Sequence, residues 1–187
     1  MTTVFLSGSR SISRTNDVIR KHLDNLISRR LYIIVGDANG ADRAMQSYFA
    51  EAGYSDVTVY CAGTRCRNNV GGWATKKVEV KPNIKGREFY EQKDREMARQ
   101  ADSGFVLWDG KSYGSITNVF ELLKSNKNVV LYFGPEKEFY DLNTIDDIDL
   151  ILSKCAPKTL EMISKKNRLP ASFSKDRESA QTSFAFS

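Results

Sequence analysis

Hydrophobic residues along the 187-residue chain gather in short unbroken runs separated by amphipathic segments. The runs have the length of single strands and lie at residues 3–8, 31–36, 57–61, 103–109 and 128–133. The segments between them repeat apolar residues at a helical period and lie at residues 13–30, 41–52, 87–101 and 115–125. Apolar runs without alternation are typical of parallel strands covered on both faces. The pattern therefore predicts an α/β fold, a doubly wound parallel sheet with right-handed crossovers.

One internal segment, residues 62–86, departs from this alternation. It has no clear period, and it combines Arg65 and Arg67 with several amides, glycines and Trp73. Long loops in compact domains are usually functional or disordered. Two interpretations are open: an insertion that acts as a lid over a base or phosphate, or a β-hairpin arm for dimerisation in which residues 76–80 alternate as a strand.

The C-terminal part changes character after Gly134-Pro135. Residues 1–134 are expected to form the α/β domain, and residues 135–168 a helical extension with short helices at 146–153 and 158–166. Residues 169–187 are rich in Ser, Ala, Lys and Phe without periodicity, which predicts disorder.

Three of the predicted strands end in loops that contain glycine. A strand that ends in such a loop and feeds a helix presents free backbone N–H groups to an anion. Because ligands of parallel sheets bind beyond the carboxyl ends of the strands, the loops are expected to converge on one ligand that carries phosphate. A capped turn or helix start would also explain each loop alone. The candidate ligand-binding residues are Gly8, Ser9, Arg10, Gly36, Asp37, Gly40, Asp109, Gly110, Gly114 and Ser115.

The net charge of +5 is concentrated near the C-terminus. From Lys154 onward seven basic residues face three acidic ones, which leaves the rest of the chain at +1. A nearly balanced core argues against nucleic acid as the partner of the α/β domain, while the basic C-terminal part keeps that alternative open.

Cysteine, histidine and hydropathy narrow the chemistry further. The three cysteines are predicted to be reduced thiols, and His22 to lie on a helix at the surface or core edge, so neither a metal site nor a cofactor is expected. No stretch approaches the roughly 20 apolar residues of a membrane span. The N-terminal residues run straight into the first strand, so we expect a cytoplasmic protein without a membrane partner.

Four motifs in this order resemble the YspA-like branch of the SLOG superfamily, Rossmann-like nucleotide-binding domains related to the DprA and LOG proteins. They are Gly8-Ser9-Arg10, Gly36-Asp37-Ala38-Asn39-Gly40-Ala41-Asp42, Asp94-Arg95-Glu96-Met97 with Ala101-Asp102, and Gly114-Ser115. The resemblance covers roughly residues 4–133 and implies a Rossmann-like sheet that binds a nucleotide-derived ligand. In LOG-type enzymes a glutamate three positions after the turn acts on the ribose side. That position is Asn118 here, and asparagine can hydrogen-bond a ribose or base but cannot act as nucleophile or general base.

Three functions are open at this point. The chain could bind a nucleotide-derived small molecule, such as a nucleoside monophosphate, ADP-ribose or a cyclic nucleotide, with Asp37 and Asp42 toward the ribose and Asn118 fixing orientation. It could instead hydrolyse or transfer an N-glycosidic bond with a carboxylate from Asp42, Asp94, Asp109 or Glu121. It could also bind single-stranded nucleic acid. A homodimer is expected only because Rossmann-like domains of this size often pair through helices.

Overall fold

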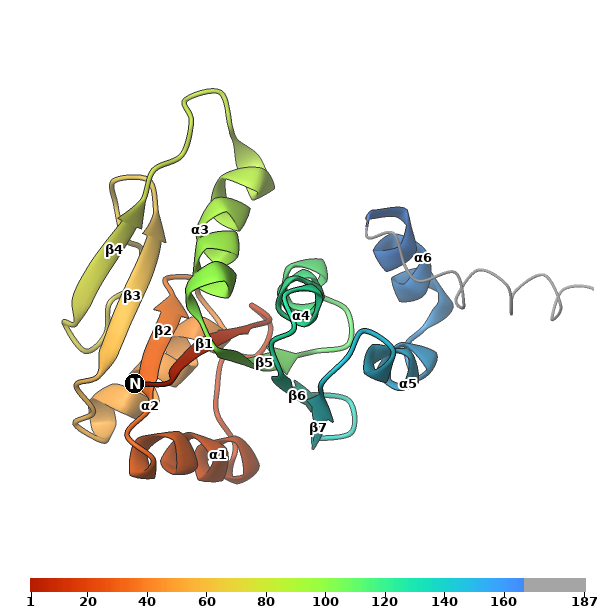
Figure 1. Ribbon diagram of the computed structural model, residues 1–187, viewed down its shortest axis with the longest axis horizontal. Helices are drawn as coiled ribbons and strands as arrows, with labels where there is room; N and C mark the ends of the chain where they lie inside the picture. Colours follow the sequence, from red (N-terminus) through yellow and green to blue (C-terminus); the bar gives the residue numbers. More distant parts are fainter. Residues whose placement is uncertain (167–187) are drawn as a thin grey trace, which may run out of the picture.

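The computed structural model describes residues 1–166, which form a seven-stranded sheet with helices on both faces (Figure 1). The strands are β1 (Thr3–Gly8), β2 (Tyr32–Gly36), β3 (Val57–Ala62), β4 (Ala74–Val78), β5 (Ser103–Trp108), β6 (Val129–Phe133) and β7 (Glu138–Leu142). Their order across the sheet is β4-β3-β2-β1-β5-β6-β7. Strands β1 to β6 are parallel, and β7 runs antiparallel to β6.

Six helices complete the described part of the chain. They are α1 (Asp17–Ser28), α2 (Ala41–Glu51), α3 (Gly86–Gln100), α4 (Tyr113–Lys124), α5 (Asp147–Ser153) and α6 (Pro157–Lys166). Leu23 of α1 and Phe49 of α2 belong to the core on one face of the sheet. Met97 of α3 and Val119 of α4 belong to the core on the other face, which α5 and α6 extend beyond β6 and β7 (Figure 1). Within residues 1–166, no helix is both long and apolar enough to cross a membrane.

Local sequence sets the beginning and the buried side of α1. The side chain of Asn16 caps the helix by accepting a hydrogen bond from the backbone N–H of Ile19 at 2.9 Å. Ile19, Leu23 and Leu26 follow at helical spacing and are buried. The apolar residues whose helical spacing predicted this helix thus form the face that packs on the sheet.

The central strand β1 marks the topological switch point of the sheet. The strands that follow β1 in sequence, β2 and β3, lie on one side of it in the sheet, and the strands after α3, β5 and β6, lie on the other side. Gly8, the last residue of β1, pairs in register with Leu107. A Cβ atom on Gly8 would lie 2.6 Å from the carbonyl oxygen of Leu107, so glycine is required where the two strands end. Ligands of doubly wound sheets bind at this kind of position.

The predicted α/β fold class and the parallel strands are confirmed, and several details differ, among them the start of α1 at Asp17 instead of residue 13. Residues 74–78 form β4, which pairs parallel with β3, so the hairpin-arm interpretation of this segment is wrong. Strand β7 was not predicted, because residues 138–142 carry no long apolar run. Helix α4 begins at Tyr113, two residues before the predicted start at 115. The predicted disorder from 169 lies outside the described residues.

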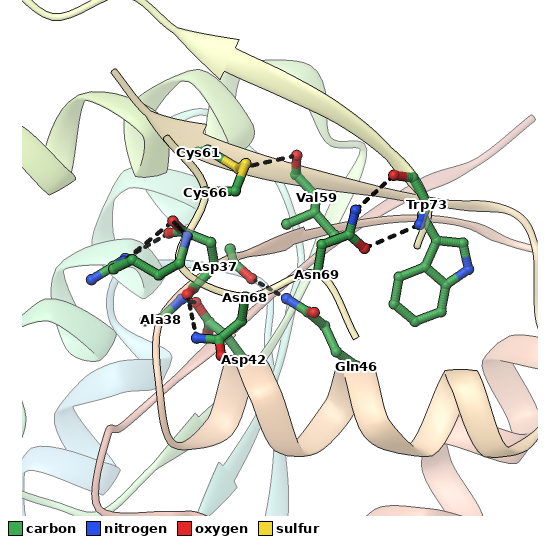
Figure 2. Close-up of a disulfide and its surroundings, with 12 residues drawn as sticks. Asp37, Ala38, Asp42, Gln46, Val59, Cys61, Cys66, Asn68, Asn69 and Trp73 are labelled. Carbon is green, nitrogen blue, oxygen red and sulfur yellow. Dashed lines mark hydrogen bonds and ion pairs between the residues drawn. A yellow bond between two sulfur atoms is a disulfide. The ribbon is translucent and has the colours of Figure 1, made fainter. Parts of the chain in front are cut away.

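The prediction of three reduced thiols is wrong for two of them. Cys61 at the end of β3 and Cys66 form a disulfide with their Cα atoms 5.1 Å apart (Figure 2). Gly63, at φ +70°, adopts the left-handed conformation that turns the chain between them. Cys155 remains a free thiol, and burial raises its pKa to about 11. The four residues between Cys61 and Cys66 do not by themselves indicate a disulfide, because pairing depends on the conformation of the turn between them.

We expect the protein purified without reductant to present only one thiol, Cys155, to iodoacetamide after denaturation, because Cys61 and Cys66 are paired. A sample reduced before alkylation should carry three adducts. Intact-protein mass spectrometry distinguishes the two states. Three adducts on the unreduced sample would show that the disulfide does not form.

Candidate functional site

A cavity of about 660 Å³, here called the main cavity, opens at the carboxyl ends of β1 and β5. The predicted site residues that line it are Gly8, Ser9, Arg10, Asp42, Asp94, Asp109, Gly114, Ser115 and Asn118. The predicted residues that do not line it are Gly36, Asp37, Gly40, Gly110 and Glu121. Other lining residues were not singled out from the sequence, among them Ser7, Arg87, Tyr90 and Lys93. Arg67, which also lines the cavity, was considered only as part of the possible lid at residues 62–86.

The carboxylate of Asp109 ties the loop after β1 to the loop after β5. One oxygen accepts hydrogen bonds from the hydroxyls of Ser9 and Ser11, both at 2.7 Å. The other accepts from the backbone N–H groups of Lys111 at 3.0 Å and Ser112 at 2.7 Å. Burial alone would raise the pKa of Asp109, but these hydrogen bonds outweigh burial and lower it to about 2. The polar side-chain atoms of Asp109 and Ser9 therefore hold the cavity wall together.

Gly40 and Gly36 lie behind the cavity wall, where other groups approach the backbone closely. Gly40 has a φ of +84°, and a Cβ atom there would lie 2.4 Å from the backbone of Arg10. A Cβ atom on Gly36 would lie 2.3 Å from Oδ2 of Asp42 and 2.7 Å from Nζ of Lys93. Both positions require glycine because of the protein's own packing.

A buried ammonium group lies between two carboxylates at the cavity wall. Lys93 on α3 is 3% exposed, and its Nζ lies 2.6 Å from Oδ1 of Asp94. Asp42, in the first turn of α2, accepts a hydrogen bond from the backbone N–H of Ala38 at 3.1 Å. Burial opposes the charge on Lys93, but Asp94 and Asp42 outweigh it and raise the pKa, so Lys93 is a cation. Burial raises the pKa of Asp42 to about 6, with Lys93 lowering it and Asp94 raising it further.

Asp37 and Arg67 form an ion pair at the edge of the cavity. Nη2 of Arg67 donates to Oδ1 of Asp37 at 2.6 Å, while Nε and the backbone N–H donate to Oδ2 at 3.2 and 3.0 Å. Burial would raise the pKa of Asp37, but the hydrogen bonds from Arg67 lower it. The guanidinium carbon of Arg67 lies 4.2 Å from the centre of the Tyr90 ring. Asp37 thus positions Arg67, and Arg67 is the member of the pair that lines the main cavity.

Helix α4 begins at the main cavity with a first turn that has no side-chain cap. Ser112 is the N-cap residue, but its hydroxyl donates to Oγ of Ser115 at 2.8 Å and caps no backbone group. The backbone N–H groups of Gly114 and Ser115 have no intrahelical acceptor. Arg87 stands beside them, since a Cβ atom on Gly114 would lie 3.6 Å from its Nη2. These groups give this end of the cavity a positive potential.

Three more polar groups at the cavity are without partners in the described part of the chain. The hydroxyl of Ser7 is buried and makes no hydrogen bond there. The side-chain amide of Asn118, on a residue that is 7% exposed, makes none with residues 1–166 either. Arg10 forms no ion pair among these residues, and its guanidinium carbon lies 6.0 Å from the centre of the Tyr90 ring. Buried polar groups in native proteins are normally hydrogen-bonded, so the buried hydroxyl of Ser7 points to a polar occupant, which the amide of Asn118 could also contact.

The arrangement suits an anionic ligand more than a metal. No cluster of three His, Cys, Asp or Glu side chains within residues 1–166 is placed to hold a metal ion. Glu91, a further acid of the cavity, lies 3.3 Å from Nε of Arg87 and 3.7 Å from Nη2 of Arg95. Asp37, Glu91 and Asp94 are ion-paired, and Asp109 is held by hydroxyl and backbone N–H donors. Arg10 is a basic group at the mouth that forms no ion pair within residues 1–166.

We expect Asp109→Asn to destabilise the fold at pH 7 by about 1–3 kcal/mol, because the amide leaves part of the hydrogen-bonding network unmatched. The folded pKa of Asp109 is lowered, so its contribution is present above the ordinary value of 3.8 and is lost as pH falls through about 2. Urea denaturation should therefore show that the difference in free energy of unfolding between wild type and variant becomes smaller below about pH 4. Asp141→Asn on the exposed side of β7 is the control. An equal difference in free energy of unfolding at pH 7 and pH 2.5 would contradict a stabilising role for the ionised carboxylate of Asp109.

For Asp42→Asn we expect the opposite trend with pH. The folded pKa of Asp42 is raised from 3.8 to about 6, so the folded state holds a proton that the unfolded state releases in this range. The stability of the wild type relative to the variant should therefore fall as pH rises from about 4 to about 7. Denaturation midpoints at pH 4.5 and pH 7.5 measure the change. A difference that stays constant or grows in favour of the wild type would refute the raised pKa.

Comparison with known proteins supports the fold and leaves the family open. No protein-family model matches the chain, and no curated protein matches it in sequence. Among solved structures it is similar to DNA processing protein A from Helicobacter pylori, described for its single-stranded DNA binding mode, with a TM-score of 0.52 and 16% identity. The match covers 70% of this chain and 64% of that one, so this chain spans less than two thirds of its length. The Rossmann-like fold shared with DprA is thereby confirmed, and the YspA-like branch stays a prediction.

Proposed function

We propose that the protein binds a nucleotide-derived small molecule in the main cavity, with its phosphate against the first turn of α4. The observation that carries the proposal is the set of unpartnered polar groups that converge there: the N–H groups of Gly114 and Ser115, the hydroxyl of Ser7 and the guanidinium of Arg10. Backbone N–H groups at a helix N-terminus with an arginine nearby are a recurrent phosphate site.

Size and polarity support a nucleotide over a bare anion. A volume of about 660 Å³ lies in the range of small-molecule sites and far exceeds what a phosphate ion needs. The amide of Asn118 can donate and accept, which suits a ribose hydroxyl or the edge of a base. The ring of Tyr90, which carries the guanidinium of Arg67 over it, adds an aromatic group to the lining. Nucleoside monophosphates, ADP-ribose and cyclic nucleotides all fit this chemistry.

One observation favours hydrolysis or transfer at an N-glycosidic bond as a second candidate. Asp42 lines the cavity, and its pKa of about 6 would suit a general acid or base near neutral pH. Asp94 lines the cavity too but is paired with Lys93, whereas Glu121 lies outside the lining. Asp42 is therefore the carboxylate on which this alternative depends.

The experiment that tests binding compares AMP and GMP with their nucleosides by isothermal titration calorimetry. Arg10→Ala should weaken binding of the monophosphates by about tenfold or more, because a charge-assisted hydrogen bond to phosphate is lost. It should change nucleoside binding far less. Arg14→Ala is the matched control, since Arg14 is an exposed arginine that does not line the cavity. Equal losses for monophosphate and nucleoside would remove the proposed phosphate position.

The same samples separate binding from turnover and from nucleic-acid binding. Mass spectrometry after incubation with nucleotides and NAD-derived compounds should recover the intact ligand. Free base with a ribose phosphate, absent from Asp42→Asn, would establish the enzyme instead. An affinity for single-stranded DNA that falls steeply with salt, combined with no binding of small nucleotides, would favour the activity described for the Helicobacter pylori protein.

A further inference from the structure

A second cavity of about 520 Å³, here called the side cavity, adjoins the main cavity. It is bounded by the loop after β3, with Thr64, Arg65 and Cys66, and by Phe89 at the beginning of α3. Arg67 and Tyr90 line both cavities, so they form the boundary between them. Two cavities that share a wall can hold the two ends of one ligand.

The side cavity has an aromatic wall that the protein core does not use. Phe89 and Tyr90 are both half-buried, and their rings meet edge to face with centroids 5.2 Å apart. Gly63 makes room for Phe89, since a Cβ atom at that position would lie 2.9 Å from its Cζ. Half-buried aromatic rings in a concave site provide stacking surfaces for planar ligands.

The opposite wall is held by interactions that do not involve a ligand. The disulfide fixes Cys66 to β3 (Figure 2). The carboxylate of Asp37 fixes the guanidinium of Arg67. The amide of Asn68 also donates to the backbone carbonyl of Asp37 at 2.8 Å. A wall that is already ordered loses little conformational entropy on binding.

The polar groups of the side cavity suit a nitrogenous ring better than an aliphatic chain. The hydroxyl of Thr64 and the guanidinium of Arg65 stand beside Phe89 and can meet the polar edge of a ring whose face stacks. Nη1 of Arg67 makes no hydrogen bond within residues 1–166, so it is available to a phosphate at the boundary. An aliphatic occupant would make no hydrogen bonds to these groups, whereas the edge of a nitrogenous ring can make them.

We propose that the side cavity takes the second base of a linear dinucleotide, two nucleosides joined through their 5′ ends by a pyrophosphate. One nucleoside occupies the main cavity, the pyrophosphate lies between the first turn of α4 and Arg67, and the second base stacks on Phe89. The inference rests on the proposed function of the main cavity and specifies its ligand class. A mononucleotide would fill the main cavity and leave the side cavity empty.

The test compares AMP and GMP with diadenosine and diguanosine 5′,5′-pyrophosphates by calorimetry on the full chain. The wild type should bind at least one of the dinucleotides about tenfold or more tightly than its mononucleotide, because the second base adds a stacking contact. Phe89→Ala should remove most of that advantage and change mononucleotide binding less than about twofold. Thr64→Trp should act in the same way by filling the side cavity, which covers the case in which Phe89→Ala disturbs the fold. Val70→Ala, on an exposed residue that lines neither cavity, is the control.

The outcomes separate this inference from the proposed function. Mononucleotide binding that depends on Arg10, without any preference for dinucleotides, would overturn the side-cavity proposal and leave the main-cavity proposal standing. The side-cavity proposal also fails if both Phe89→Ala and Thr64→Trp leave a dinucleotide preference intact. Absence of binding by every mononucleotide and dinucleotide would overturn both proposals.

Discussion

The ionised carboxylate of Asp109 is the interaction on which the geometry of the site depends. It joins the hydroxyls of the loop after β1 to the backbone N–H groups that precede α4, two segments about a hundred positions apart in sequence. Hydrogen bonds to an ionised acceptor are stronger than neutral ones, so this single side chain fixes both loops. Because its oxygens are occupied, Asp109 adds no free acceptor to the cavity. The N–H groups that have no intrahelical acceptor at the cavity are those of Gly114 and Ser115, in the first turn of α4.

Ion pairs form a second layer around this centre. Asp37 holds Arg67 at the boundary of the two cavities, and Lys93 stands between Asp94 and Asp42 at the wall. A buried ammonium is costly to desolvate and is retained only where carboxylates offset that cost. Asp37 and Asp94 are thus each paired with a base, and Asp109 is satisfied by hydroxyl and backbone N–H donors instead. Arg10 supplies charge at the mouth because no acid of the described chain neutralises it.

The sequence predicted the framework of the fold and the convergence of the loops after β1 and β5, because both follow from local patterns and from the geometry of parallel sheets. Short apolar runs indicated the strands, and the loops that follow β1 and β5 had to meet at the switch point. The sequence could not separate residues that face a ligand from residues that hold the loops. Gly36 and Gly40 were recognised as positions of close approach, but the approaching groups are Lys93, Asp42 and the backbone of Arg10.

The burial of Lys93 and the pairing of Arg67 with Asp37 were missed for a related reason. On a charged helix such as α3, a lysine normally belongs to the solvated face, and only the tertiary packing of α3 against the strands buries this one. Arg67 lies in a segment without periodicity, and its position depends on the turn closed by the disulfide and on its pairing with Asp37. Long-range pairings of this kind leave no periodic trace in a single sequence, and the same holds for β4 and β7.

The distribution of satisfied and unsatisfied groups also bears on the choice between binding and chemistry. Asp109 has its oxygens occupied and a pKa of about 2, Asp94 is paired with Lys93, and Glu121 lies outside the cavity lining. Asp42 has a pKa nearer neutrality, but one of its oxygens accepts the N–H of Ala38 and lies against Gly36. The loop after β2 thus engages Oδ2 of Asp42, while its other oxygen makes no hydrogen bond within residues 1–166. Most of the other cavity groups without partners are hydrogen-bond donors, and donors hold an anion in place without exchanging a proton with it. For this reason we favour binding of a phosphate-bearing ligand over proton transfer as the proposed function.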